Sequence, residues 1–293
     1  MNGNLPTGKT SLEAQGPSRK GVKDQVIERF EQKYIVHPRL VPEIRKFIKP
    51  FCVPDPNGKG AVPEYSVTTL QLDNAQMDLA LAKERKAYAR FKLRIRTYGT
   101  KPEHPVFFEL KRKINNVIVK SRAKMTLGEY YGGPYAGSIV IEPGLAPMLK
   151  TPKDNNNFLE YCRIVRKLNA RPKMLIRYVR ESYFGANDDY ARVTFDRRVS
   201  YRPTKDWRIP VQDDGKLWRP MDTQTGLNRP FAGYIFELKA MSDSPRWMIE
   251  LVERFNLNTT GFCKYATAWR LENIYRGNEY SAQSENVTLI DNA

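Results

Sequence analysis

Apolar and charged residues alternate repeatedly along this 293-residue chain. The clearest example is ARFKLRIRTYG (89–99), where Phe91, Leu93 and Ile95 fall on one parity and Lys92, Arg94 and Arg96 fall on the other. Alternation with a period of two is the pattern of a β-strand with two unlike faces. The chain must therefore build strands that are apolar on one face and cationic on the other.

The same pattern returns in five further segments. They are ERFEQKY (28–34), FFELKRK (107–113), VIVKSRAKM (117–125), YARVTFDR (190–197) and YIFELKA (234–240). Between the strands, the spacing of apolar residues favours helices at 38–51, 75–88, 157–169 and 244–256, the last with Ser244 as its N-cap. Together these patterns predict an α+β fold built on a large antiparallel β-barrel or a strongly curved sheet, with flanking helices.

The charge balance decides between two interpretations of the charged strand faces. A single such face is normally the solvated side of a sheet, but this chain has 49 Lys and Arg against 32 acids, a net charge of +17. In a barrel these faces would converge, and like charges facing each other without a ligand are strongly unfavourable. A phosphate chain inside reverses that balance, because Arg and Lys both bind phosphate oxygens. The sequence therefore favours a polyanionic ligand.

Composition divides the chain into a core and two polar ends. Residues 1–23 are rich in Gly, Pro, Ser and Lys and are predicted to be disordered, residues 24–280 form the predicted domain, and 281–293 form a polar tail. No apolar run is long enough for a membrane span, and no signal peptide is evident. The three cysteines are far apart in sequence and are expected to be buried free thiols, which favours a cytoplasmic location.

Several classes of site are disfavoured by the absence of their motifs. The sequence has no P-loop, no dinucleotide-binding glycine motif and no Cys/His cluster with zinc spacing. Only two histidines are present, so a Ser-His-Asp set is not expected. The aromatic residues within the basic segment 83–94 lie on the apolar parity, so we expect no nucleic-acid partner.

The ordered motifs resemble the VTC (vacuolar transporter chaperone) domain, a branch of the triphosphate tunnel metalloenzyme superfamily. The matching elements are E-x-K-Y (31–34), R-x-R-x-Y-G (94–99), E-x-K (109–111), a paired-arginine element (178–196), a second E-x-K (237–239) and a terminal S-K-[FY] in which Cys263 replaces Ser. The resemblance implies a β-barrel tunnel in which ATP donates its γ-phosphate to a growing polyphosphate chain. Eukaryotic relatives carry a sensor domain and a membrane anchor, so we expect a stand-alone, bacterial-type member.

Carried over position by position, the resemblance also implies a set of site residues. The expected catalytic phosphate ligands are Lys33, Arg94, Arg96, Lys111, Arg180, Arg192 and Lys264. The expected substrate-binding residues are Lys120, Arg122, Lys124, Tyr178 and Lys239, with the register of the strand 119–125 left open. Glu237 matches the metal-binding acid, with Glu109 and Glu31 as further candidates. The implied cofactor is a divalent metal, with Mn²⁺ favoured over Mg²⁺.

Two other functions use the same residues. A triphosphatase would pass the γ-phosphate to water, and a binding module would hold polyphosphate without turning it over. The hydrolytic branch of the superfamily opens with E-x-E-x-K, whereas this chain has Arg29 in place of the first Glu. That difference favours the polymerase, and the retention of Glu237 disfavours a binding module. The sequence leaves the oligomeric state and the role of residues 203–231 open.

Overall fold

The computed structural model describes residues 29–99, 101, 103–114, 117–132, 149–187, 190–210, 214–241 and 244–277. The predicted disordered segment 1–23 and the predicted tail 281–293 lie outside the described residues. Within them, the alternating segments all form strands and the predicted helices all form, with shifted ends.

The strands form one antiparallel sheet, which confirms the predicted α+β class. Along the sheet the order is β1 (Arg29–Val36), β10 (Tyr234–Met241), β8 (Arg192–Pro203), β7 (Arg171–Gly185), β3 (Glu64–Asp73), β4 (Ala89–Thr97), β5 (Pro105–Ile114) and β6 (Val117–Thr126). Two short strands lie off this path, with β2 (Cys52–Pro54) beside β7 and β9 (Arg219–Pro220) beside β8. Sequence-distant motifs thus become neighbours.

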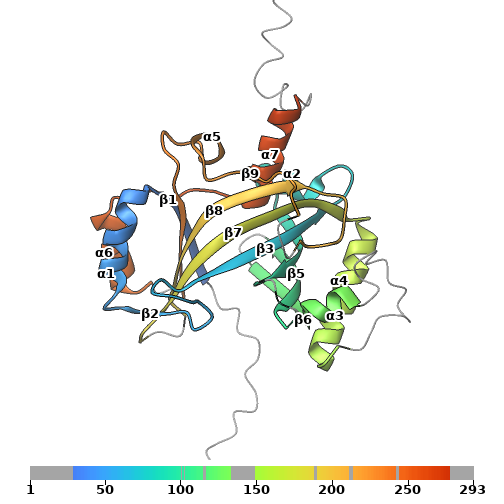
Figure 1. The fold of residues 1–293 in the computed structure, drawn as a ribbon, viewed down its shortest axis with the longest axis horizontal. Coiled ribbons are helices and arrows are strands. Elements are labelled where there is room, and N and C mark those ends of the chain that lie inside the picture. The colour runs from blue at the N-terminus through green and yellow to red at the C-terminus, as the bar shows by residue number, and fades with distance from the viewer. Residues whose placement is uncertain are drawn as a thin grey trace, which may run out of the picture.

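Helices flank the sheet in three groups (Figure 1). On one side lie α1 (Val41–Ile48), which follows the short 3₁₀ helix η1 (Pro38–Leu40), and α6 (Arg246–Arg254). On the opposite side lie α3 (Leu127–Gly132) and α4 (Pro152–Lys167). The third group is α2 (Asp78–Glu84) and α7 (Lys264–Arg276), with the short α5 (Gln224–Leu227) nearby.

The apolar parity of the strands forms two cores under the first two helix groups. On one side, Phe195 and Phe236 pack with Ile44 of α1 and Leu251 of α6. On the other side, Ile95, Phe108 and Leu110 pack with Phe158 and Tyr161 of α4. The opposite parity, which carries the cations, is therefore left for the other face of the sheet.

Helix α7 closes one end of that other face. Its Ala268 and Leu271 belong to a third core with Val67, Ile176 and Ile235 of the sheet. The Tyr265 hydroxyl also donates a hydrogen bond to Asp73 at 2.9 Å. The residues before α7 cover the free edge of β1, because the Thr260 amide donates to the Lys33 carbonyl at 2.7 Å.

The insertion 203–231 is a covering segment. Trp207 and Ile209 are buried in the core next to α3 and α4. The Tyr130 hydroxyl of α3 donates a hydrogen bond to the Trp207 carbonyl at 2.5 Å. Within this segment, whose role the sequence left open, Trp207 and Ile209 thus extend the outer layer, whereas Met221 and Leu227 pack in the third core with α7.

Three local predictions were wrong. Helix α4 begins at Pro152, before the predicted start at 157, because the Thr151 side chain caps it by accepting from the Asp154 amide at 3.0 Å. The N-cap of α6 is Pro245 and not Ser244. Cys263 is partly exposed and not buried, because it lies at the start of α7 beside the charged strand face.

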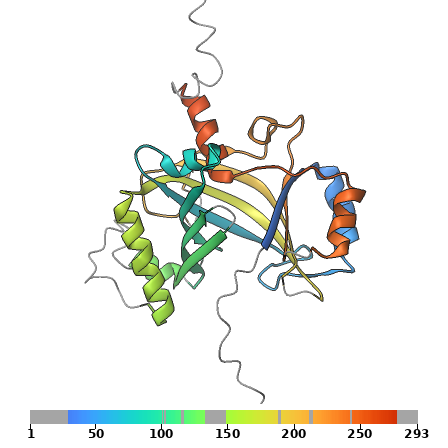
Figure 2. The same ribbon diagram turned by 180° about the vertical axis from the view of Figure 1, so that it is seen from behind.

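The sheet curves until its two ends approach each other. The Lys111 ammonium of β5 lies 3.7 Å from the Glu31 carboxylate of β1. Figure 2 brings these ends to the front, with β1 in blue and β5 and β6 in green. Among the described residues no backbone ladder joins β6 to β1, so the sheet is strongly curved but not closed by hydrogen bonds. None of the helices in the described ranges has the length and apolar character needed to cross a membrane.

Candidate active site

The inner face of the curved sheet is the face on which Lys111 meets Glu31. It carries every site residue predicted on a strand. By strand, its polar and aromatic residues include Glu31 and Lys33 (β1), Glu237 and Lys239 (β10), Arg192, Thr194 and Asp196 (β8), Tyr178 and Arg180 (β7), Tyr65 and Thr69 (β3), Lys92, Arg94 and Arg96 (β4), Phe107, Glu109 and Lys111 (β5), and Lys120, Arg122 and Lys124 (β6).

Strand register explains why these residues meet. Lys33 lies opposite Glu237, and Glu109 lies between Arg94 on one side and Arg122 on the other. Directly opposed residues on one face have close Cβ atoms, so each carboxylate is in reach of cations from both neighbouring strands. The register of the basic strand, left open by the sequence, is thereby defined.

Glu109 is a fully buried acceptor for several cations. Its Oε2 lies 2.6 Å from Arg94 Nε, and its Oε1 lies 3.0 Å from Arg122 Nη2 and 3.2 Å from Lys120 Nζ. Arg96 Nη1 is 3.7 Å away. Burial alone would raise the pKa of Glu109, but these cations outweigh burial and hold the pKa well below its ordinary range. Glu109 therefore stays ionised and fixes the surrounding guanidinium groups.

Asp196 is a second buried acceptor for cations, on the other side of the inner face. It accepts two hydrogen bonds from Arg180, at 2.7 and 2.8 Å, and one from the Lys264 ammonium at 2.6 Å. Burial would raise the pKa of Asp196, but Arg180 and Lys264 lower it below its ordinary value. Lys264 is the first residue of α7, so helix placement and strand register converge on one buried carboxylate.

Glu31 and Glu237 form a pair of carboxylates with looser cation contacts. Lys33 Nζ lies 3.0 Å from Glu31 and 3.9 Å from Glu237, and Lys239 Nζ lies 3.3 Å from Glu237. Burial would raise the pKa of Glu31, but a hydrogen bond with Glu237 and the nearby lysines lower it. Arg180 Nη2 lies 3.8 Å from Glu237 and links this pair to the Asp196 cluster.

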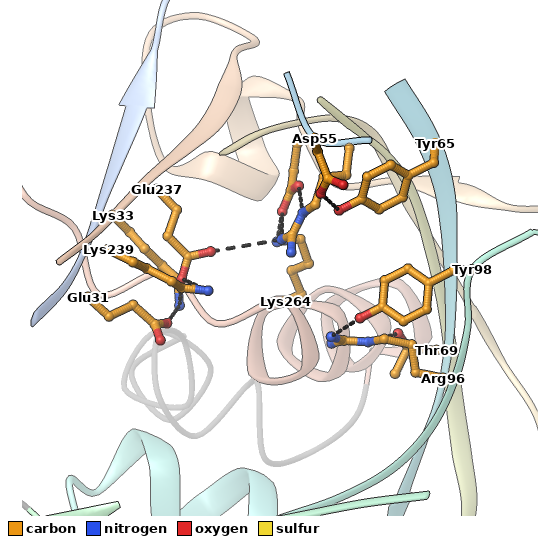
Figure 3. Close-up of polar contacts among 12 residues, drawn as sticks. Glu31, Lys33, Asp55, Tyr65, Thr69, Arg96, Tyr98, Glu237, Lys239 and Lys264 are labelled. Carbon is orange, nitrogen blue, oxygen red and sulfur yellow. Dashed lines mark hydrogen bonds and ion pairs between the residues drawn. The ribbon is translucent and has the colours of Figure 1, made fainter. Parts of the chain in front are cut away.

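The labelled side chains face a common space from two walls (Figure 3). Glu31, Lys33, Glu237 and Lys239 lie on one wall, and Arg96 and Tyr98 lie on the facing wall. Lys264 lies between them at the end of α7. The arrangement leaves cations on several sides of this space.

The remaining predicted residues also belong to this face. The Arg192 guanidinium lies 4.2 Å from the Phe184 ring centre, and the Lys264 ammonium lies 4.7 Å from that of Tyr178. Lys124 is opposite Phe107 and exposed.

Like charges on this face disfavour one another when no anion is bound. Burial and the neighbouring Arg96 lower the pKa of Arg94 despite its contact with Glu109. Burial and nearby cations also lower the pKa values of Lys111 and Lys120. A multivalent anion would relieve this repulsion, so the geometry suits a phosphate chain.

Sequence reasoning missed three inner-face groups. Asp196 has the same parity as Arg192 along the strand. This shared parity was the signal that could have placed Asp196 on the inner face. Tyr98 lies within the R-x-R-x-Y-G motif, and its hydroxyl accepts hydrogen bonds from Arg96 at 3.3 Å and Arg122 at 3.4 Å. Lys92 has the parity of Arg94 but no counterpart among the residues that the resemblance implies, and its ammonium lies 3.7 Å from the Cys263 sulfur.

The Lys92–Cys263 contact perturbs both groups. Burial would raise the pKa of Cys263, but Lys92 and other nearby donors and cations lower it to about 7. The Cys263 thiolate would raise the pKa of Lys92, but burial and neighbouring cations lower it to about 8. No sequence signal linked residues so far apart.

The three predicted metal ligands do not form one cluster. Among the described residues no group of three or more His, Cys, Asp or Glu side chains is placed to hold a metal ion. Glu31 and Glu237 fit a divalent cation that takes its remaining oxygens from phosphates, as Mg²⁺ commonly does. Glu109 fits poorly, because both of its oxygens are occupied by Arg and Lys donors.

The fold and the inner face define an α+β protein with a cation-lined curved sheet that suits a phosphate chain. The sequence model of the VTC domain matches residues 28–272. The chain belongs to the VTC domain family.

A curated relative is vacuolar transporter chaperone complex subunit 4 of Schizosaccharomyces pombe. It is 25% identical over 272 residues, which covers 81% of this chain and 36% of the relative. The chain thus spans about a third of that protein's length.

Two solved structures are also similar. One is an adenylyl cyclase candidate from Hippeastrum, described as having a dominant triphosphatase activity, with 14% identity, a TM-score of 0.43 and coverage of 81% of this chain and 93% of that one. The other is an adenylate cyclase candidate from Vibrio parahaemolyticus, with 11% identity, a TM-score of 0.40 and coverage of 83% and 98%. We draw no conclusion from similarities as weak as these.

Proposed function

We propose that this protein is a polyphosphate polymerase that transfers the γ-phosphate of ATP onto an inorganic polyphosphate chain. The observation that carries the proposal is the inner face, where cations from several strands and α7 surround a common space and outnumber the acids. Membership of the VTC domain family supports the same assignment. No protein nucleophile is needed, since an oxygen of the acceptor phosphate can attack directly.

In the proposed reaction, a terminal oxygen of the acceptor chain attacks the γ-phosphorus of ATP. The bond from that phosphorus to the β,γ-bridging oxygen breaks, and ADP leaves with the electron pair. Arg94 and Arg96 of β4, Arg180 of β7 and Lys264 of α7 hold the phosphates in line and balance the charge that develops. Glu109 and Asp196 keep these cations aimed at the substrate.

We propose that Glu237, with Glu31, holds the divalent metal. When bound, the metal would supply positive charge that offsets the negative charge of the phosphates. Lys33 and Lys239 now lie against these carboxylates and would turn towards the phosphates. Oxygen ligands suit both Mn²⁺ and Mg²⁺, and Mn²⁺ stays the prediction from the family resemblance.

A direct test incubates the purified protein with ATP and Mn²⁺ or Mg²⁺ and resolves the products on a gel stained for polyphosphate. The proposal predicts a ladder of long chains that requires a divalent metal. Phosphate release with no ladder would identify a triphosphatase. Tight polyphosphate binding with no turnover would identify a binding module.

A further inference from the structure

One wall of the inner face carries three neighbouring aromatic rings, which the phosphate chemistry does not require. Tyr65 lies in β3, Tyr98 directly follows β4 and Phe107 lies in β5, and all three are partly exposed. The ring centres of Tyr65 and Tyr98 are 5.9 Å apart, and those of Tyr98 and Phe107 are 5.7 Å apart. We call these three rings the aromatic wall.

The inner-face positions named here on the two strands opposite, β1 and β10, are charged. There β1 and β10 present Glu31, Lys33, Glu237 and Lys239, which lie apart from Tyr65 and Tyr98 in Figure 3. A phosphate chain alone gains nothing from partly exposed rings. A ligand with an aromatic part at one end and phosphates at the other would match both surfaces.

Arginines join the aromatic wall directly to the phosphate-binding cluster. The Arg122 guanidinium lies 3.8 Å from the Phe107 ring centre, and both Arg122 and Arg96 donate to the Tyr98 hydroxyl. The same two arginines contact Glu109. Guanidinium planes and aromatic rings are surfaces on which nucleobases stack.

We propose that the aromatic wall binds the base of the nucleotide substrate, with Tyr98 and the Arg122–Phe107 stack as its stacking surface. This inference rests on the proposed function and adds an orientation to it. The base lies against β3, β4 and β5, and the triphosphate runs past Arg96 towards Glu237 and Lys264. Stacking tolerates every base, so other nucleoside triphosphates would also bind.

The test compares binding of ATP with binding of inorganic triphosphate, both measured by calorimetry in EDTA so that no turnover occurs. Phe107→Leu and Tyr98→Leu remove a ring but keep an apolar side chain. Each is expected to weaken ATP binding by about five-fold or more, as loss of base stacking does. Phe107→Leu should leave the affinity for inorganic triphosphate close to that of the wild type. Tyr98→Leu should bind inorganic triphosphate as a Tyr98→Phe variant does, because both lack the hydroxyl that Arg96 and Arg122 contact.

Two control variants sharpen the comparison. Tyr98→Phe keeps the ring and removes the hydroxyl that Arg96 and Arg122 contact, so it should retain the preference for ATP. Phe51→Leu removes a partly exposed ring that stacks on Trp247 of α6, outside the inner face, and should leave ATP binding unchanged. Thermal unfolding of each variant checks that it is folded.

The outcomes separate this inference from the proposed function. Equal losses for both ligands, or no loss for ATP in either Leu variant, would overturn the aromatic wall as a base site. A wild-type protein that binds inorganic triphosphate as tightly as ATP would overturn it too and leave the phosphate-binding face intact. A wild-type protein that binds neither ligand would overturn both proposals.

Discussion

The F-E-L-K sequence occurs twice, in β5 and in β10, and each copy places its Glu and Lys on the inner face in different surroundings. In β5 the motif places Glu109 where Arg94, Arg122 and Lys120 occupy both of its oxygens at 2.6 to 3.2 Å. In β10 it places Glu237 beside a second carboxylate, Glu31, and its cation contacts are 3.3 to 3.9 Å. One carboxylate is saturated and the other is loosely held.

This difference teaches that strand neighbours, and not the motif itself, set the role of each acid. Glu109 lies between two strands that each contribute an arginine, so its negative charge is neutralised by neighbouring cations. Glu237 lies beside Lys33 and Thr194, so its oxygens stay available to a metal. Both motifs predict a metal ligand by resemblance, but the geometry favours only the second.

The largest effect is expected from Glu237→Gln. If this carboxylate holds the metal, its loss should reduce metal-dependent turnover by at least about 100-fold. Stability should fall less than in a Glu109→Gln variant, because the ion pairs of Glu237 are longer than those of Glu109. Binding of inorganic triphosphate in EDTA should be unchanged or tighter, since a negative charge is removed. Turnover close to wild type would refute the metal assignment.

Glu109→Gln should have its main effect on stability, whereas Glu237→Gln has its main effect on turnover. It leaves Arg94, Arg122 and Lys120 close together without their shared acceptor, so the free energy of unfolding should fall by about 3 kcal/mol. Denaturant unfolding measures this loss, and added polyphosphate should restore much of it by replacing the missing anion. A fully stable variant with no turnover would instead make Glu109 a metal ligand.

Asp196→Asn tests whether Asp196 positions Arg180 and Lys264, or whether the phosphate ligand is bound only through the net positive charge of the inner face. Removing this charge makes the inner face more positive, so long-range attraction alone predicts tighter binding of inorganic triphosphate. If Asp196 aims Arg180 and Lys264, binding should instead weaken by about ten-fold, with a matching rise in KM for ATP. Calorimetry measures whether inorganic triphosphate binds more tightly or more weakly. Tighter binding would show that Asp196 does not position these cations.

The smallest effect concerns thiol chemistry. With its pKa lowered to about 7, Cys263 should react with iodoacetamide readily at neutral pH. Its thiolate fraction, and so its rate, should rise from pH 6 to 8 and then level off. Burial raises the pKa values of Cys52 and Cys162 to about 12, so these two serve as internal controls.

Lys92→Met should slow the alkylation of Cys263 several-fold, because it removes the cation beside the sulfur. Mass spectrometry of the alkylated peptides measures all three thiols in one sample. Equal rates at the three cysteines would contradict the Lys92–Cys263 interaction.

The local alternation predicted much of this structure because it depends only on which face of a strand is buried. It placed Arg94 and Arg96 on one face and Leu93 and Ile95 on the other, as observed. It could not predict the saturation of Glu109 or the pairing of Glu31 with Glu237, because both depend on the order of strands. It also missed Lys92 beside Cys263, where the entry of α7 brings together residues 171 positions apart.

The most direct test of the account is a mass balance of one reaction with ATP, Mn²⁺ and a short polyphosphate primer. ADP, free phosphate and acid-insoluble polyphosphate are measured together, with Glu237→Gln as the inactive control. The account predicts that the phosphate lost from ATP is recovered in polymer, with little free phosphate. Free phosphate equal to the ADP formed, and no gain in polymer, would contradict it.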